Sequence, residues 1–294
     1  MIGAVVALLP ASSAAASTSA NPSFAALLRL YAYTGSKPLD VRENAVDKER
    51  GYTVHDLSYA SPIRGRVSAY LVVPDGSGPF PAILWQPGLG GTRSTQLTDA
   101  ISLAREGAAS LLIDSPDVRS GGPNLIACER RDRLPFIQYA VDLRRGVDLL
   151  ATRPNIDVSR IGDVGFSYGS TIAGVLSGVE HRLKAVVIES GRAYHTGFLR
   201  DTCRGDLSKK RMAAYLASMD FSNPFRYVAH AAPTRLLIQN GRLDEFTPRK
   251  EALKLQRAAS KPKTIRWYAG SHGLTPRAFA DRDRFLETTL HFGG

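Results

Sequence analysis

The stretch of sequence that decides the fold is RIGDVGFSYGSTIAGVL, residues 160–176. Its first six residues predict a buried strand and its last seven an apolar helix, with Gly165-Phe166-Ser167-Tyr168-Gly169 as the turn between them. The two glycines remove Cβ atoms that would collide in such a tight turn, which leaves the serine hydroxyl clear of the sheet. A glycine-rich turn without chemistry would use similar residues, but the strand before it and the helix after it favour Ser167 as a nucleophile.

A serine hydroxyl needs a base to take its proton, and His272 is the best candidate among the six histidines. It lies in Gly270-Ser271-His272-Gly273-Leu274, directly after the final predicted strand. Hydrolases with a serine on such a strand-to-helix turn have the basic histidine last along the chain. We expect the other five to be packing or surface residues. They lie before the core, behind the nucleophile helix, at the ends of a long polar segment or in the last helix: His55, His181, His195, His230 and His291.

The imidazole in turn needs a carboxylate that fixes its tautomer and stabilises its protonated form. The loop at 240–248 follows the predicted strand at 234–239 and offers two neighbouring carboxylates, Asp244 and Glu245. Asp244 is the candidate, and Glu245 stays its rival, because adjacent residues face different ways and the sequence does not show which carboxylate points inward.

Two backbone N–H groups should bind the negative oxygen of a tetrahedral intermediate. One normally comes from the residue after the nucleophile, here Tyr168, and one from the loop after an earlier strand. The segment QPGLGG at 86–91 follows a predicted strand and is rich in glycine, which makes Leu89 the second candidate donor. An ordinary strand-to-helix turn is the alternative interpretation of this loop.

Short apolar runs alternate with helical patterns from about residue 52 onward, which predicts a largely parallel sheet with crossover helices. A polar segment at 191–230, with its own helix at 207–219, predicts a lid inserted between core strands. We expect residues 21–51 to be a helical lead-in and 52–294 to be one catalytic domain. The predicted strands are 67–73, 82–86, 109–113, 160–165, 184–189, 234–239 and 264–268, and the predicted helices are 94–106, 136–151, 170–176, 250–259 and 276–291.

Five motifs follow one another along the chain: Gly78-Pro79-Phe80-Pro81-Ala82, Asp142-Leu143-Arg144-Arg145, Arg160-Ile161-Gly162 leading to the serine turn, Asn240-Gly241 with Asp244, and Gly270-Ser271-His272-Gly273. Together they resemble the α/β-hydrolase superfamily, and within it the dienelactone hydrolase-like and acetyl-xylan-esterase-like branch, over about residues 52–291. The resemblance implies a mostly parallel twisted sheet with helices on both faces, and it favours Asp244 over Glu245. Two residues depart from the branch: Pro87 stands where its oxyanion loop usually has histidine, and Ser167 replaces the cysteine of dienelactone hydrolases proper.

The expected function is hydrolysis of a small-molecule carboxylic ester through an acyl-enzyme intermediate, without a cofactor or a metal. The alternatives are a peptidase or amidase of the prolyl-oligopeptidase type, and a catalytically silent hydrolase fold that acts as a binding protein. Prolyl-oligopeptidase-type enzymes enclose peptides with a large propeller domain, and the roughly thirty residues between the predicted signal peptide and the first core strands are too few for one. The lid could offer Arg200, Arg204 or Lys209 to an anionic substrate, although solvent-facing charges would look the same.

The 294 residues are 44% hydrophobic and 22% charged, an ordinary globular composition with a formal net charge of +11. Positive charge concentrates at 130–133 and 209–211 without interleaved aromatic residues. We therefore expect a generally basic surface and no nucleic-acid partner. We also expect no membrane span, and the sequence leaves the oligomeric state open.

Residues 1–20 carry no charged side chain and combine a short apolar run with a segment of small residues, which predicts a signal peptide. Because no Lys or Arg precedes the apolar run, a disordered tail is the alternative. We expect a secreted or periplasmic protein, with a cytoplasmic one as the alternative. Cys128 and Cys203 fit a single disulfide in an exported protein, and two free, partly buried thiols otherwise.

Overall fold

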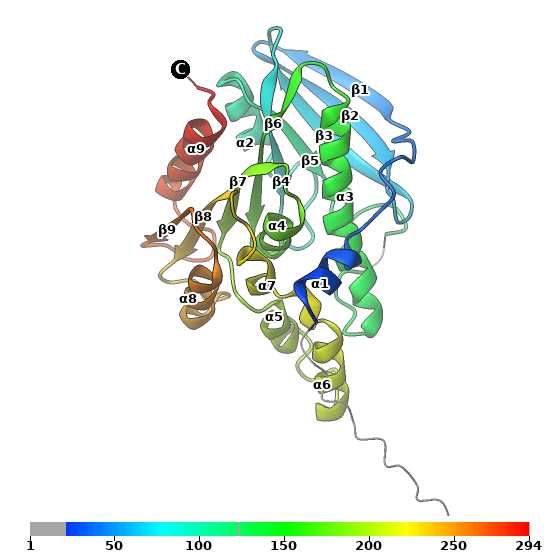
Figure 1. Ribbon diagram of the computed structural model, residues 1–294, viewed down its shortest axis with the longest axis vertical. Coiled ribbons are helices and arrows are strands. Elements are labelled where there is room, and N and C mark those ends of the chain that lie inside the picture. Colours follow the sequence, from blue (N-terminus) through cyan, green and yellow to red (C-terminus); the bar gives the residue numbers. More distant parts are fainter. Residues whose placement is uncertain (1–21, 123, 294) are drawn as a thin grey trace, which may run out of the picture.

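The computed structural model describes residues 22–122 and 124–293, which contain a nine-stranded sheet with the order β1-β2-β3-β5-β4-β6-β7-β8-β9 (Figure 1). The pairs β1/β2, β2/β3 and β3/β5 are antiparallel, and all pairs from β5 across to β9 are parallel. The sheet is therefore mostly parallel, as predicted. The strands are β1 Arg42–Glu49, β2 Tyr52–Ala60, β3 Arg66–Pro74, β4 Phe80–Gln86, β5 Ala109–Ile113, β6 Ile156–Phe166, β7 Leu183–Glu189, β8 Arg235–Gly241 and β9 Lys263–Tyr268.

Helices cover both faces of the sheet and bury two separate apolar clusters against it (Figure 1). Helices α1, α3 and α4 contribute to the larger cluster, and α2 and α9 to the smaller one. No helix among the described residues is long and apolar enough to cross a bilayer. The helices are α1 Phe24–Leu30, α2 Leu97–Arg105, α3 Arg133–Ala151, α4 Tyr168–Val179, α5 His195–Thr202, α6 Lys209–Ser218, α7 Phe225–Val228, α8 Arg249–Ala258 and α9 Pro276–Leu290, with short 3₁₀ turns η1 Arg130–Asp132 and η2 Asp220–Ser222.

Strands β4 and β7 and residues 161–165 of β6 are buried on both faces, which explains the apolar runs of β4 and β7. Residues 82–85 of β4 and 185–188 of β7 are completely buried. Because β4 and β6 to β9 are parallel, their carboxyl ends meet at one edge of the sheet. The loops that carry the candidate site residues all leave the sheet at this edge.

The expectation of a helical lead-in over residues 21–51 is wrong for most of that segment. Only Phe24–Leu30 is α-helical, and Arg42–Glu49 forms the edge strand β1, paired antiparallel with β2. Every residue of β1 is exposed, so the strand has no apolar face and gives no alternating pattern to detect. Its polar character suits an edge strand, which has a free row of backbone groups. The predicted signal peptide lies outside the described residues.

The segment predicted as a lid follows β7 and contains α5, α6 and α7, and α6 confirms the helix predicted at 207–219. A disulfide between Cys128 and Cys203, with 5.7 Å between the Cα atoms, joins this segment to the loop after β5. A second tie lies beside it, where the Tyr215 hydroxyl donates to the Asp132 carboxylate at 2.7 Å. The inserted helices are thus fixed to the loop that precedes α3.

Reduction of the Cys128–Cys203 disulfide should lower the free energy of unfolding by about 4 kcal/mol, because the bond closes a long loop in the unfolded chain. The cysteines are 75 positions apart. Urea unfolding with and without reductant measures the difference. The Cys128→Ser, Cys203→Ser double variant should be as unstable as reduced wild type and insensitive to reductant. Equal stability of oxidised and reduced wild type would contradict this expectation.

Candidate active site

Ser167 sits on a strained turn between β6 and α4, with φ 55° and ψ −113°. Two close backbone approaches make glycine necessary on either side of it. A Cβ added at Gly165 would lie 2.3 Å from the Gly169 carbonyl oxygen, and one added at Gly169 would lie 2.1 Å from the Gln86 carbonyl oxygen. The Ser167 N–H donates to the Glu189 carbonyl at 3.0 Å, which anchors the turn to β7.

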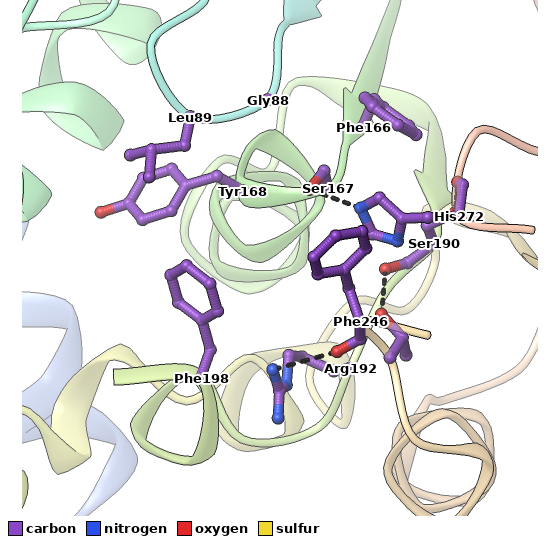
Figure 2. A pocket seen from close by; sticks show the side chains of 11 residues that line it. Gly88, Leu89, Phe166, Ser167, Tyr168, Ser190, Arg192, Phe198, Phe246 and His272 are labelled. Atoms are coloured by element: carbon purple, nitrogen blue, oxygen red, sulfur yellow. Dashed lines mark hydrogen bonds between the residues drawn. The ribbon is translucent and has the colours of Figure 1, made fainter. Parts of the chain in front are cut away.

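The three predicted residues Ser167, His272 and Asp244 are brought together at the carboxyl edge of the sheet. The His272 Nε2 atom lies 2.7 Å from the Ser167 Oγ (Figure 2). Its Nδ1 atom lies 2.9 Å and 3.0 Å from the two carboxylate oxygens of Asp244. One imidazole therefore links a hydroxyl to a carboxylate through opposite ring nitrogens.

Asp244, not its rival Glu245, contacts the imidazole. The Asp244 side chain is 1% exposed, whereas Glu245 is exposed to solvent. Its Oδ1 also accepts the N–H groups of Phe246 at 2.9 Å and Thr247 at 2.8 Å. Burial raises the pKa of Asp244, but the hydrogen bonds from His272 and Thr247 outweigh it and hold the pKa below its ordinary value. The carboxylate is thus charged at neutral pH.

Hydrogen bonds between three loops hold His272 in place. The Ser190 Oγ donates to the His272 carbonyl at 2.6 Å, and the Thr247 Oγ1 donates to the Ser190 carbonyl at 3.0 Å. The ring centroids of Phe166, at the end of β6, and Phe246, in the loop after β8, lie 5.3 Å and 5.0 Å from the centroid of the imidazole. The base is fixed at its backbone and enclosed at its ring.

Both predicted oxyanion donors border the same cavity as the serine. The Leu89 loop packs against the nucleophile turn, since a Cβ added at Gly88 would lie 3.5 Å from the Ser167 Cβ. The N–H groups of Leu89 and Tyr168 make no hydrogen bond to the rest of the described chain. Each of them is therefore available to a ligand oxygen.

The cavity next to Ser167 has a volume of about 320 Å³ and a mostly apolar lining. The lining residues that were not singled out from the sequence include Arg192, Phe198 and Phe246. The first two follow β7 in the inserted segment, where no periodic pattern points to a function. The lining residues are Gly88, Leu89, Phe166, Ser167, Tyr168, Ser190, Arg192, Phe198, Phe246, Thr247 and His272 (Figure 2).

His195 lies close to the site but has a structural environment. It is buried, its Nδ1 atom lies 2.8 Å from the Ser222 Oγ, and its ring packs against Phe136 and Tyr168. Burial lowers the pKa of His195 to about 3, and the charge of Arg192 acts in the same direction. The ring is neutral at physiological pH and behaves as a packing residue.

The family model for FrsA-like esterases matches residues 40–220. The chain belongs to the FrsA-like esterase family. It is a carboxylic ester hydrolase, as expected from the sequence. No curated protein matches the chain significantly.

Solved structures with the same fold include several esterases. This FrsA-like esterase is similar to acetyl xylan esterase from Paenibacillus sp. R4, with 19% identity, a TM-score of 0.75 and coverage of 90% of this chain and 92% of that one. It is also similar to acetyl xylan esterase 1 from Thermoanaerobacterium sp. JW/SL YS485, with 17% identity, a TM-score of 0.73 and coverage of 90% of this chain and 92% of that one. A third similar structure is glucuronoyl esterase from Solibacter usitatus, with 14% identity, a TM-score of 0.62 and coverage of 90% of this chain and 91% of that one. At these identities the likeness shows the fold, which is that of the α/β-hydrolases.

A buried polar pair supports the site of this FrsA-like esterase from below. The Gln86 amide donates to the Asp163 carboxyl, and both residues are fully buried. Burial raises the pKa of Asp163 to about 8, so its carboxyl is mostly protonated at neutral pH. A protonated carboxyl can donate back to the Gln86 carbonyl oxygen, which has no other partner among the described residues. The pair therefore joins β4 to β6 beneath the oxyanion loop and the serine turn.

Residues 22–122 and 124–293 hold no group of three or more His, Cys, Asp or Glu side chains placed to bind an ion.

Replacing Gly169 with alanine should destabilise the FrsA-like esterase by about 3 kcal/mol or more, because the new Cβ would meet the Gln86 carbonyl oxygen and force the backbone apart. Chemical denaturation measures the effect. Gly35→Ala is the matched control, since nothing lies within 4 Å of a Cβ at that position. Equal stability of the two variants would show that the turn is not held by this contact.

Proposed function

We propose that Ser167, His272 and Asp244 form the catalytic triad of a serine carboxylesterase that acts through an acyl-enzyme. The observation that carries this proposal is the continuous hydrogen-bonded chain from the Ser167 Oγ through His272 to a buried, charged Asp244. Such a chain lets the imidazole take the serine proton while the carboxylate fixes its tautomer.

In the first half of the reaction, the Ser167 Oγ attacks the ester carbonyl as its proton moves to the His272 Nε2 atom. The N–H groups of Leu89 and Tyr168 stabilise the negative oxygen that develops. His272 then donates the proton to the alkoxide, which leaves as the alcohol. Asp244 stabilises the imidazolium between these two steps without being protonated itself.

In the second half, a water molecule attacks the acyl-enzyme while His272 accepts its proton. The tetrahedral intermediate collapses, the carboxylic acid is released, and the Ser167 hydroxyl is restored. The same imidazole thus serves as base and acid in each half of the reaction.

The substrates we propose are esters with a small acyl group. A cavity of about 320 Å³ suits a small ligand better than an extended peptide. An amide would also need its nitrogen protonated in good alignment, whereas an alkoxide leaves with modest help. The similar acetyl xylan esterases are named for the removal of a small acyl group.

We also propose that the protein is exported. The chain contains the Cys128–Cys203 disulfide, and disulfides form and persist in oxidising compartments outside the cytoplasm. The composition of residues 1–20 supports the same location. Cell fractionation with detection of the processed amino terminus tests this proposal.

The Ser167→Ala variant should fold normally and lose hydrolysis of 4-nitrophenyl acetate by roughly 10³-fold or more, because oxyanion stabilisation cannot replace the nucleophile. Steady-state kinetics on purified protein, with thermal denaturation as the check on folding, measures the loss. Retained turnover in the pure variant would exclude Ser167 as the nucleophile.

The two neighbouring carboxylates should differ sharply in their effect on turnover. Asp244→Asn should lower kcat by roughly 10³- to 10⁴-fold, because an amide favours the wrong imidazole tautomer. Glu245→Gln removes the same charge one residue along and should change kcat by less than about twofold, since the Glu245 side chain is exposed and surface substitutions have small effects. Kinetics of both variants at neutral pH makes the comparison, and the reverse pattern would exchange the two roles.

A further inference from the structure

Arg192 lines the cavity beside Ser167 and is the one permanently charged residue among those that line it. In Figure 2 its side chain lies on the opposite side of the cavity from Ser167, between Phe198 and Phe246. It follows the carboxyl end of β7 by three residues, so the sheet itself positions it at the site. A Cβ at Gly197 would lie 3.1 Å from its Nη2 atom, so the helix that begins at His195 leaves just enough room for the guanidinium.

The Arg192 guanidinium is poorly satisfied by the rest of the described chain. Its one hydrogen bond runs from Nη1 to the Phe246 carbonyl at a long 3.4 Å, and its Nε is buried without a partner. No carboxylate of the described residues forms an ion pair with it. Burial lowers the pKa of Arg192, and Glu251, Asp201 and Asp244 offset this only in part. A half-buried cation with so few hydrogen-bond partners favours a ligand that supplies them.

The arginines and lysine that the sequence suggested for an anionic substrate do not fill this role. Arg200, Arg204 and Lys209 are exposed, and none of them lines the cavity. Arg204 is also paired with Asp201 at 3.0 Å. Arg192 is therefore the cation that a substrate bound at Ser167 would meet.

We propose that Arg192 binds a carboxylate that the substrate carries at the end remote from its scissile ester. A guanidinium offers two parallel N–H donors that match a carboxylate, and such pairs are strong where water is scarce. The apolar side chains of Phe198 and Phe246 line the same cavity, and the net charge of +11 attracts anions to the protein. This inference rests on the proposed function and adds a substrate class to it, short esters that bear a free carboxylate.

The test compares charged esters with neutral partners of nearly the same shape. On the acyl side, mono-4-nitrophenyl adipate is paired with 4-nitrophenyl methyl adipate. On the alcohol side, 4-carboxyphenyl acetate is paired with 4-(methoxycarbonyl)phenyl acetate. The ratio of kcat/KM within each pair, measured in a pH-stat, is determined for wild type, Arg192→Gln, Arg192→Lys and the exposed control Arg200→Gln.

We expect wild type to prefer the charged ester in one of the two pairs, which identifies the part of the substrate that carries the carboxylate. In that pair, Arg192→Gln should lower the charged-to-neutral ratio by about 10- to 100-fold. Arg192→Lys should restore part of the preference, and Arg200→Gln should keep all of it. A purely structural role for Arg192 would lower both members of a pair equally.

Wild type that hydrolyses all four esters without a charge preference, or a ratio unchanged in Arg192→Gln, would overturn this inference and leave the esterase proposal intact. Wild type that hydrolyses none of the four, and no 4-nitrophenyl acetate, would overturn the proposed function and this inference with it. The two failures are thus distinguished by the neutral esters.

Discussion

Close contact between the Gly169 backbone and the Gln86 carbonyl allows Ser167 to stand at the head of the central strands. A side chain at either flanking glycine would push the serine turn away from the sheet, because the added Cβ would come within 2.3 Å of a carbonyl oxygen. The positive φ of Ser167 is tolerated because β4, β6 and β7 hold the turn from below. The loop that carries Leu89 and the imidazole of His272 both meet the hydroxyl where this turn places it.

The loops that bring His272 and Asp244 to this point are in direct contact. A Cβ at Gly241 would lie 2.3 Å from the Ser271 carbonyl oxygen, so the end of β8 and the histidine loop are in direct contact. The Leu243 N–H donates to the Gly270 carbonyl at 3.0 Å, which joins the same two loops again. The Asp244 side chain is therefore buried next to His272, and hydrogen bonds from His272 and from the backbone of its own loop keep it charged. Loop packing thus sets the position of the carboxylate, and hydrogen bonds set its charge.

Much of this arrangement could be predicted from the sequence because the central strands are buried on both faces. Their apolar runs, the glycines around Ser167 and the chain order of serine, aspartate and histidine are local signals with a direct physical cause. The edge strand β1 gave no such signal, since all its side chains are exposed. Arg192 could not be found in advance either, because it lies in an inserted segment where only the folded chain shows which charges face the cavity. The pairing of Cys128 with Cys203 stayed open for the same reason, as the sequence does not show which loops meet.

The central claim is that Ser167 is the activated nucleophile of this esterase. Labelling with a fluorophosphonate probe, followed by digestion and mass spectrometry, tests it most directly because the probe reacts with a serine whose hydroxyl is activated by a neighbouring base. The account predicts one label per chain, on the peptide that contains Ser167, with ester hydrolysis lost in proportion to labelling. A label on another residue, or full hydrolysis by a fully labelled protein, would contradict it.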